Sequence, residues 1–258
     1  MQNSDLKEKL MPVFPNYFER YAANNNGVIT WLFDQDDISD YGVCASICAH
    51  WIRYHSDDRH LATELTRKER GLFNKSRFNK AEVRRIVNLQ LSRLGKREDV
   101  TGIISQAMDL QNWLEIFGLR LLFHPVTHRV LFNCKEYMDE LTAKDSFTQS
   151  HLMVNALLNY TSCYVLIAVH NFDVTNLSLD NPGMGHFLCA WLGDAQSDVV
   201  FFEPSSGEVW FERRSDFAKF ARDYFGEAMV LHKCTEWELY PLAKPALVQG
   251  FEMVDAPA

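Results

Sequence analysis

Apolar side chains recur at helical spacing through much of the first part of the chain. Between Cys44 and Tyr54 the small and apolar residues lie one turn apart, which predicts a buried helix that begins near Val43. Before it, residues 28–33 form a short apolar run that suits a strand or a helix. Two longer stretches have the pattern of amphipathic helices. They are 58–117, interrupted at 73–76 and 96–99, and 135–158.

A different pattern follows, in which short runs of strand-forming residues alternate with turn signals. The first run, 163–170, is continuous and apolar, as expected of a buried strand. The other predicted elements are strands at 119–123, 185–191, 199–202 and 208–211, a helix at 216–225, and a last strand within 228–240. Helices first and antiparallel strands later predict an α+β fold.

The length and composition indicate a globular protein. The chain has 258 residues, of which 47 % are apolar and 23 % are charged. This length fits one large domain or two small ones. We predict a single domain over 1–258, with a helical half at about 28–160, an antiparallel sheet half at about 161–240, and short tails.

The acidic charge of the chain restricts its partners. The formal net charge is -8, and an acidic surface repels phosphate backbones, so we expect no nucleic-acid partner. No stretch of about eighteen apolar residues occurs, so we expect no integral membrane segment. The N-terminus lacks a basic segment followed by an apolar one, so any export would use a route independent of a signal peptide.

The cysteines argue against disulfides and metal. There are six, at positions 44, 48, 134, 163, 189 and 234. Six are too few for a disulfide scaffold in a chain of this length, and no CxxC pair favours zinc. We therefore expect no metal and no cofactor, several buried thiols, at most one reactive thiol, and a reducing compartment.

Cys44 is the candidate nucleophile. It follows a turn signal that ends in Gly42, and it opens the predicted buried helix. A helix N-terminus presents unpaired backbone N–H groups and partial positive charge, which favour the reactive thiolate. The same N–H groups can bind the oxyanion of a tetrahedral intermediate. The alternative is that Cys44 is a small core residue.

His186 is the candidate general base. A glycine-rich loop delivers it at the start of the strand predicted at 185–191. A rigid strand end beside an open loop suits a base that must meet a substrate. The alternative is an isolated surface histidine, and the other candidate bases are His124, His151 and His170.

Glu203 is the candidate acid that orients the base. It ends the strand predicted at 199–202, and a hairpin turn at 193–197 would place position 186 opposite roughly 202–204. Neighbouring strands lie about 4.8 Å apart, so the carboxylate can reach the imidazole and hold its tautomer. The alternatives are the carboxylates of Asp194 and Glu208 and the amides of Asn171, Asn176 and Asn181.

Three pieces of the sequence together resemble the YopT/AvrPphB-type cysteine proteases, a papain-like family of bacterial secreted effectors. They are Gly42-Val43-Cys44-Ala45-Ser46 with Trp51 downstream, Gly185-His186, and Phe201-Phe202-Glu203-Pro204 before Gly207-Glu208 and Phe211. The resemblance covers 40–55 and 183–212. It implies a papain-like fold, with the nucleophile on the N-terminus of a buried helix that packs on a C-terminal antiparallel sheet, and a triad of Cys44, His186 and Glu203.

The chain departs from the family pattern at two places. The acid is Glu203, where the family normally has aspartate, and the extra methylene moves the carboxylate. The family also tends to place an amide a few residues before the nucleophile, where it helps to bind the oxyanion. The nearest amide here is Gln35, and the backbone N–H of Cys44 can serve beside it.

The resemblance implies a cysteine protease that acts on a protein substrate. It further implies an effector or toxin that is delivered into another cell and acts in the host or target-cell cytoplasm, with a secretion chaperone as a candidate partner. Two alternatives stay open. One is a deamidase or transglutaminase-like acyl transferase that uses the same cysteine and histidine, and the other is a non-enzymatic binding module.

Overall fold

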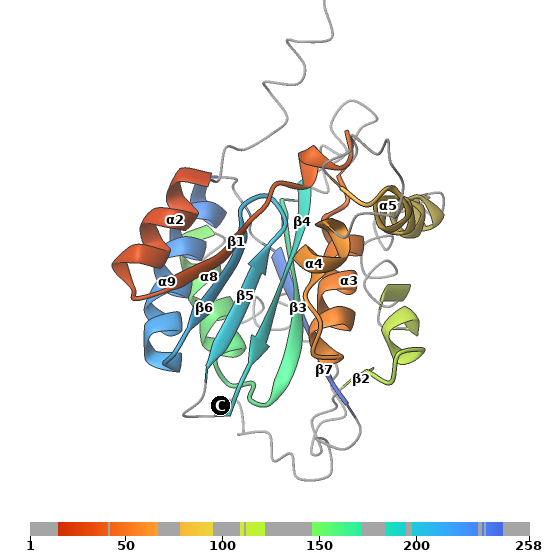
Figure 1. Cartoon of the computed structure of the whole chain (residues 1–258). Coiled ribbons are helices and arrows are strands. Elements are labelled where there is room, and N and C mark those ends of the chain that lie inside the picture. Colours follow the sequence, from red (N-terminus) through yellow and green to blue (C-terminus); the bar gives the residue numbers. More distant parts are fainter. Residues whose placement is uncertain are drawn as a thin grey trace, which may run out of the picture.

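The computed structural model describes residues 15–40, 42–66, 78–94, 109–110, 112–121, 146–171, 184–194, 198–231, 234 and 236–244. Within them, seven strands form one antiparallel sheet in the order β1-β6-β5-β4-β3-β7-β2 (Figure 1). The strands are β1 (Val28–Leu32), β2 (Arg120–Leu121), β3 (Cys163–Asn171), β4 (Met184–Leu192), β5 (Val199–Glu203), β6 (Gly207–Phe211) and β7 (Glu236–Ala243). The helices are α2 (Pro15–Asn24), the short 3-10 helix η1 (Gln35–Asp37), α3 (Cys44–Ser56), α4 (Leu61–Thr66), α5 (Lys80–Leu94), α8 (Ser146–Leu157) and α9 (Arg214–Leu231).

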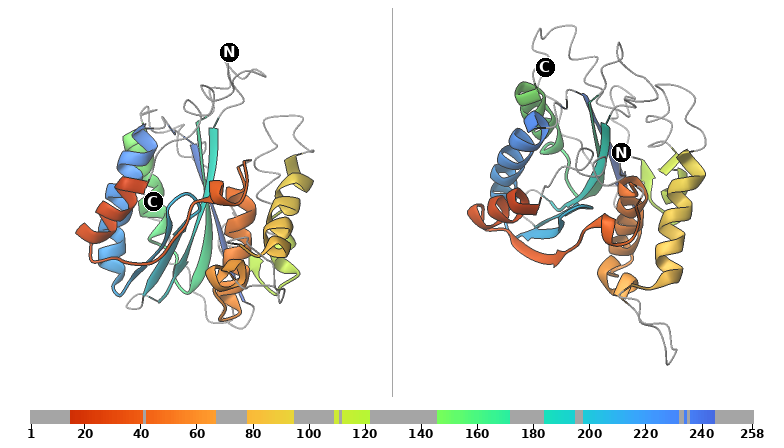
Figure 2. Two further views of the ribbon diagram at one scale, coloured as in Figure 1. Left: turned by 45° about the horizontal axis from the view of Figure 1, so that its top comes forward. Right: turned by 90° about the horizontal axis from the view of Figure 1, so that it is seen from above.

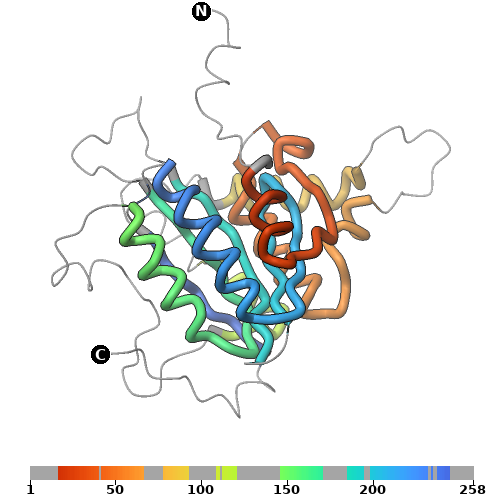
Figure 3. The backbone as a smooth tube through the Cα atoms, turned by 90° about the vertical axis from the view of Figure 1, so that its left-hand side faces the viewer, coloured from red at the N-terminus to blue at the C-terminus, as the bar shows by residue number. Residues whose placement is uncertain are grey.

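Helices cover both faces of this sheet. On one face lie α2, α8 and α9, and on the other lie α3, α4 and α5 (Figure 1). The view from above shows the same three layers (Figure 2), and Figure 3 looks directly onto the layer of α2, α8 and α9. The α+β class predicted from the sequence is confirmed.

Two hydrophobic cores fill the space between the layers. Along β3, Val165 and Ile167 belong to the core under α9, whereas Leu166 and Ala168 belong to the core under α3. A central strand that is buried on both faces needs apolar residues at every position, which explains the continuous apolar run that predicted β3.

The predicted elements correspond well with those of the sheet and its neighbours. The helix expected near Val43 begins at Cys44 with Val43 as its N-cap, and α9 is longer than the helix predicted at 216–225. The expected breaks at 73–76 and 96–99, and the first part of the helix at 135–158, lie outside the described residues.

The predicted helical half and sheet half each contribute elements of the other kind. β1 and β2 come from the 28–160 half, yet both join the sheet, and α9 comes from the 161–240 half. These elements correspond to the sequence signals at 28–33, 119–123 and 216–225. The single-domain assignment stays a prediction. None of the helices described is long and apolar enough to cross a bilayer.

Candidate active site

Cys44 is the first residue of α3, and its side chain is partly exposed. The other cysteines in the described residues, Cys48, Cys163, Cys189 and Cys234, are buried. One turn along α3, the Cys48 thiol donates to the carbonyl of Phe187 at 3.4 Å, so this helix packs directly on β4. Cys44 is therefore held at the end of a helix that is fixed to the strand carrying His186.

His186 lies near the start of β4, where β4 pairs with β3 on one side but not yet with β5 on the other. It pairs with Val169 of β3, whereas the ladder between β4 and β5 begins at Cys189. The imidazole remains 20 % exposed. Because β5 ends before it reaches this position, the side chain of His186 is supported by the sheet and still accessible.

Glu203 is the last residue of β5, and its side chain is fully buried. Its Oε1 lies 2.7 Å from Nε2 of His186 and accepts the backbone N–H of Ser205 at 2.9 Å. Its Oε2 accepts the hydroxyl of Tyr224 at 2.8 Å. The predicted acid therefore lies within hydrogen-bond distance of the predicted base.

The register of the hairpin differs from the sequence-based expectation. Cys189 pairs with Phe202, so the same register, continued, would place position 186 opposite 205 and not opposite 202–204. Glu203 therefore approaches His186 along a diagonal of the hairpin. Diagonal neighbours in an antiparallel pair are about 7–8 Å apart, within reach only of long side chains. A glutamate is better suited than an aspartate to span this separation.

The electrostatics of the pair favour a charged imidazolium beside a carboxylate. Burial opposes the charging of His186, but the charge of Glu203 and hydrogen bonds with Cys44 and Glu203 raise the pKa of His186 well above its usual value. Burial would likewise raise the pKa of Glu203, but the charge of His186 and the donors around the carboxylate lower it. The imidazole therefore interacts with the Cys44 side chain as well as with Glu203.

The alternative acids have other positions. Glu208 accepts the indole N–H of Trp51 at 2.6 Å and the hydroxyl of Thr30 at 2.5 Å, so it supports α3 and β1. Asp194 is exposed after the end of β4. Asn176 and Asn181 lie outside the described residues, and only the backbone of Asn171 is described.

The alternative bases also lie apart from this arrangement where they are described. His151 is half-buried on α8 and contacts the carbonyl of Phe147 at 3.0 Å. His170 is buried on β3, where Nε2 lies 3.7 Å from Oε2 of Glu238. His124 is outside the described residues.

Gln35 joins the start of α3 to the turn after β5. Its Oε1 accepts the backbone N–H of Val43 at 3.1 Å, and its Nε2 donates to the hydroxyl of Ser205 at 3.0 Å. Its own backbone N–H donates to the carbonyl of Pro204 at 2.8 Å. The residue predicted to help the oxyanion is thus bonded next to both Cys44 and Glu203, and its role in binding an oxyanion stays a prediction.

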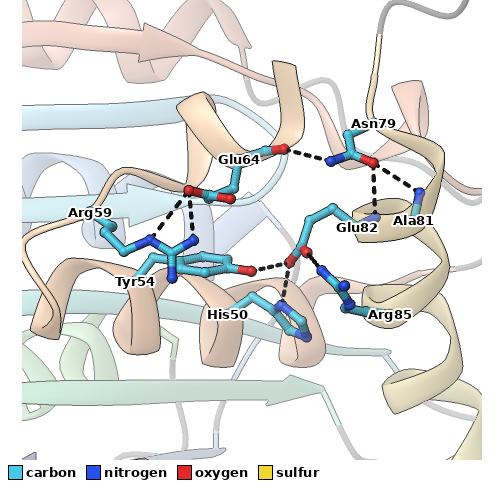
Figure 4. Close-up of polar contacts among 8 residues, drawn as sticks. All are labelled: His50, Tyr54, Arg59, Glu64, Asn79, Ala81, Glu82 and Arg85. Atoms are coloured by element: carbon cyan, nitrogen blue, oxygen red, sulfur yellow. Dashed lines mark hydrogen bonds and ion pairs between the residues drawn. The ribbon is translucent and has the colours of Figure 1, made fainter. Parts of the chain in front are cut away.

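A second buried histidine–carboxylate pair links α3 to α5 (Figure 4). Nδ1 of His50 lies 2.9 Å from Oε1 of Glu82, and the Tyr54 hydroxyl donates to the same oxygen at 2.7 Å. The other oxygen accepts Nη1 of Arg85 at 2.6 Å. Neither this cluster nor the Tyr224 contact was expected, because the residues sit within ordinary helical patterns. No group of three potential metal ligands is found among the described residues.

Comparisons with known proteins agree with the family suggested by the motifs. Residues 17–236 match the model of a peptidase family described as Yersinia/Haemophilus virulence surface antigen. The cysteine protease yopT1 of Yersinia enterocolitica is 25 % identical over 214 residues, and the cysteine protease YopT of Yersinia pestis is 24 % identical over 212 residues. These alignments cover 83 % and 81 % of this chain but 58 % of each relative, so the chain spans little more than half their length.

Two solved structures are also similar. The Pseudomonas avirulence protein AvrPphB matches with a TM-score of 0.46 and 12 % identity, covering 80 % of this chain and 94 % of that one. The YopT domain of the Pasteurella multocida PfhB2 toxin matches with a TM-score of 0.29 and 18 % identity, covering 92 % and 98 %.

Proposed function

The chain belongs to the peptidase family described as Yersinia/Haemophilus virulence surface antigen, and from this membership we propose that it is a cysteine peptidase. In this proposal Cys44 is the nucleophile, His186 the general base and Glu203 the residue that orients the base. The observation that supports it most strongly is the position of His186. Its Nε2 lies 2.7 Å from buried Glu203, and interaction with Cys44 is among the causes that raise the pKa of its ring.

The proposed reaction uses both partners of the imidazole. The Cys44 thiolate attacks the substrate carbonyl carbon, while the proton it has lost is held on His186. The tetrahedral intermediate collapses, the C–N bond breaks, and His186 gives its proton to the leaving amine. Water then adds to the thioester with His186 as base, which releases the acid product and restores the thiol.

Two kinds of donor are proposed for the oxyanion of the intermediate. One is the backbone N–H of Cys44 at the start of α3, where the helix dipole also favours negative charge. The other is the side-chain amide of Gln35, whose nitrogen carries a second N–H besides the one donated to Ser205. Its bond to Val43 places this amide next to the nucleophile.

A protein is the proposed substrate, because the similar curated proteins are named as cysteine proteases. We propose that the chain is a secreted effector or toxin that acts in the cytoplasm of a host or target cell. A secretion chaperone is a candidate partner, and the net charge of -8 argues against nucleic acid.

The test is to incubate the wild-type chain and Cys44→Ala with a lysate of candidate target cells and to label new protein N-termini for mass spectrometry. A peptidase creates new N-termini that depend on Cys44. Conversion of glutamine to glutamate without chain cleavage would instead favour the deamidase. Identical proteomes with both proteins would contradict any enzymatic function in that lysate and favour the binding module.

A further inference from the structure

The acid of the proposed triad is held from the opposite layer of the molecule. The hydroxyl of Tyr224, on α9, donates to Oε2 of Glu203 at 2.8 Å. Tyr224 is 2 % exposed and Glu203 is fully buried. Cys44, in contrast, begins α3, which lies on the other face of the sheet (Figure 1). Glu203 therefore connects the site to the core beneath α9.

The ring of Tyr224 is fixed by aromatic neighbours on several sides. It stacks on Phe220 at a centroid distance of 5.4 Å and an interplanar angle of 9°. The edge-to-face neighbours are Phe18 at 6.0 Å, Phe201 at 5.8 Å and Phe225 at 5.3 Å. Aromatic pairs at these separations restrict ring motion, so the hydroxyl is presented to Glu203 from a rigid position.

The two oxygens of Glu203 have different donors. Oε1 faces His186 and the backbone N–H of Ser205, whereas Oε2 faces Tyr224. Rotation of the carboxylate would break bonds at both oxygens, and a buried oxygen without a donor is costly. Since the glutamate reaches His186 diagonally and has one more rotatable bond than an aspartate, it needs a second anchor to keep one orientation.

We propose that Tyr224 is a positioning residue, whose hydroxyl orients the carboxylate of Glu203 so that Oε1 meets Nε2 of His186. This inference rests on the proposed function of the Cys44–His186 pair. Tyr224 acts through Glu203 and does not touch the reacting atoms.

The test measures how fast Cys44 is alkylated by iodoacetamide, resolved by mass spectrometry, in the full wild-type chain and in Tyr224→Phe. We expect the rate at neutral pH to fall about tenfold in Tyr224→Phe, because a hydrogen bond to a charged group is lost while the ring remains. Circular dichroism should show an unchanged fold.

The pH profile separates positioning from packing. Among the described residues, His186 and Tyr224 contact Glu203, and Cys48 and Cys189 interact with it electrostatically. The Tyr224 hydroxyl is one of the donors that keep the pKa of Glu203 low. Its removal raises that pKa, so the acidic limb of the alkylation profile should move to higher pH. A packing defect would lower the rate without moving the limb, and that result would overturn the inference.

Tyr240→Phe is the matched control. Tyr240 is also a buried tyrosine whose hydroxyl donates to a buried carboxylate, that of Glu238, beside His170. The Tyr240→Phe variant should lose about as much stability as Tyr224→Phe. Its rate of Cys44 alkylation should nevertheless depend on pH as in wild type. In a Glu203→Gln background, Tyr224→Phe should add no further loss of rate. An additive loss would show that Tyr224 does not act through Glu203.

The failure of this inference can be told from failure of the proposed function. If His186→Ala slows alkylation of Cys44 but Tyr224→Phe leaves its rate and profile unchanged, only the role of Tyr224 is wrong. If His186→Ala leaves the rate unchanged as well, the proposed function is contradicted.

Discussion

Among the described residues, two sets of a histidine, a glutamate and a tyrosine have the histidine within hydrogen-bond distance of the carboxylate, whereas in a third set His170 lies 3.7 Å from Glu238. In one, His186 lies 2.7 Å from Glu203, which also binds Tyr224. In the other, His50 lies 2.9 Å from Glu82, which also binds Tyr54 (Figure 4). By residue type and distance the two sets are nearly the same.

Their surroundings make them different. The His186 side chain is 20 % exposed and its pKa is raised in part by interaction with Cys44, whereas His50 is 2 % exposed and stacks on Trp113. In the second set, Arg85 binds the remaining oxygen of Glu82 and shares its charge. Burial therefore dominates at His50 and lowers its pKa, with help from the charges of Arg53 and Arg85, while the pKa of His186 is raised.

The comparison teaches that a histidine–carboxylate pair alone does not identify an active site. A site also needs a nucleophile on the second ring nitrogen and access for a substrate. The His50 set joins α3 to α5 and holds the helix that begins with Cys44. We interpret the His50 set as structural support for the helix that carries Cys44. We interpret the His186 set as the catalytic groups.

The largest expected effect separates the two histidines. His186→Ala should lower peptidase activity by several orders of magnitude, as should Cys44→Ala, and the double variant should be no worse because the two groups act as one unit. His50→Ala should retain the activity of its folded fraction but unfold more easily. Cleavage kinetics with a substrate found in the lysate experiment provide the measurement. Additive losses in the double variant would mean that the two residues do not share a step.

Glu203→Gln should have the next largest effect. The amide keeps the shape but removes the charge that stabilises the imidazolium, so the rate should fall by about 10⁴, less than with loss of Cys44 or His186. The same kinetics measure it. An activity equal to wild type would show that Glu203 does not orient the base, even though its Oε1 lies within hydrogen-bond distance of Nε2 of His186.

Glu82→Gln should act on stability and leave the chemistry intact. Loss of the carboxylate weakens its bonds with His50, Tyr54 and Arg85, and we expect the free energy of unfolding to fall by about 1–3 kcal/mol. Urea titration at neutral pH measures it. A Glu82→Gln chain that is as stable as wild type but inactive would reverse the interpretation of the two sets.

The pH dependence of that stability follows from the pKa of Glu82. Burial opposes its ionisation, but hydrogen bonds with His50, Tyr54 and Arg85 lower the pKa from 4.5 to about 2. The stabilisation is therefore present above the unfolded value of 4.5 and is lost as the pH falls toward about 2. The urea concentration at the unfolding midpoint is measured for wild type and Glu82→Gln at a series of pH values. The difference between the two midpoints should shrink as the pH falls over this range. A constant difference would contradict the assignment.

The smallest expected effect is that of Arg85→Ala. The Arg85 side chain is 63 % exposed, so its bond with Glu82 is largely screened by water. We expect a change in the free energy of unfolding within about 1 kcal/mol, measured by the same urea titration. A larger loss would show that Arg85 is essential to neutralise the buried carboxylate.

The sequence predicts the parts of the site that lie at element boundaries. Cys44 opens a helix after Gly42, and His186 and Glu203 lie at strand ends, so turn signals and periodicity locate all three. The central strands were predictable for the same reason, because burial on both faces demands continuous apolar runs.

The remaining features depend on packing between distant elements. Tyr224 reaches Glu203 only because α9 crosses the face of the sheet opposite α3, and nothing in the local pattern of α9 indicates that contact. The hairpin register placed 186 opposite 205, which a turn estimated from sequence could not resolve. Glu82 appeared as one charge on an amphipathic helix, although its side chain is 1 % exposed.

The central claim is that Cys44 and His186 form one reactive unit, and the rate of Cys44 alkylation by iodoacetamide at mildly acidic pH tests it most directly. Because Cys44 is more exposed than the other described cysteines, the comparison must be made at Cys44 itself, between wild type, His186→Ala and His50→Ala. The thiolate is the form that iodoacetamide alkylates, and a neighbouring histidine that takes the thiol proton makes this form available. We predict a fall of at least about hundredfold in His186→Ala and a rate close to wild type in folded His50→Ala. Equal rates in all three proteins would contradict the account.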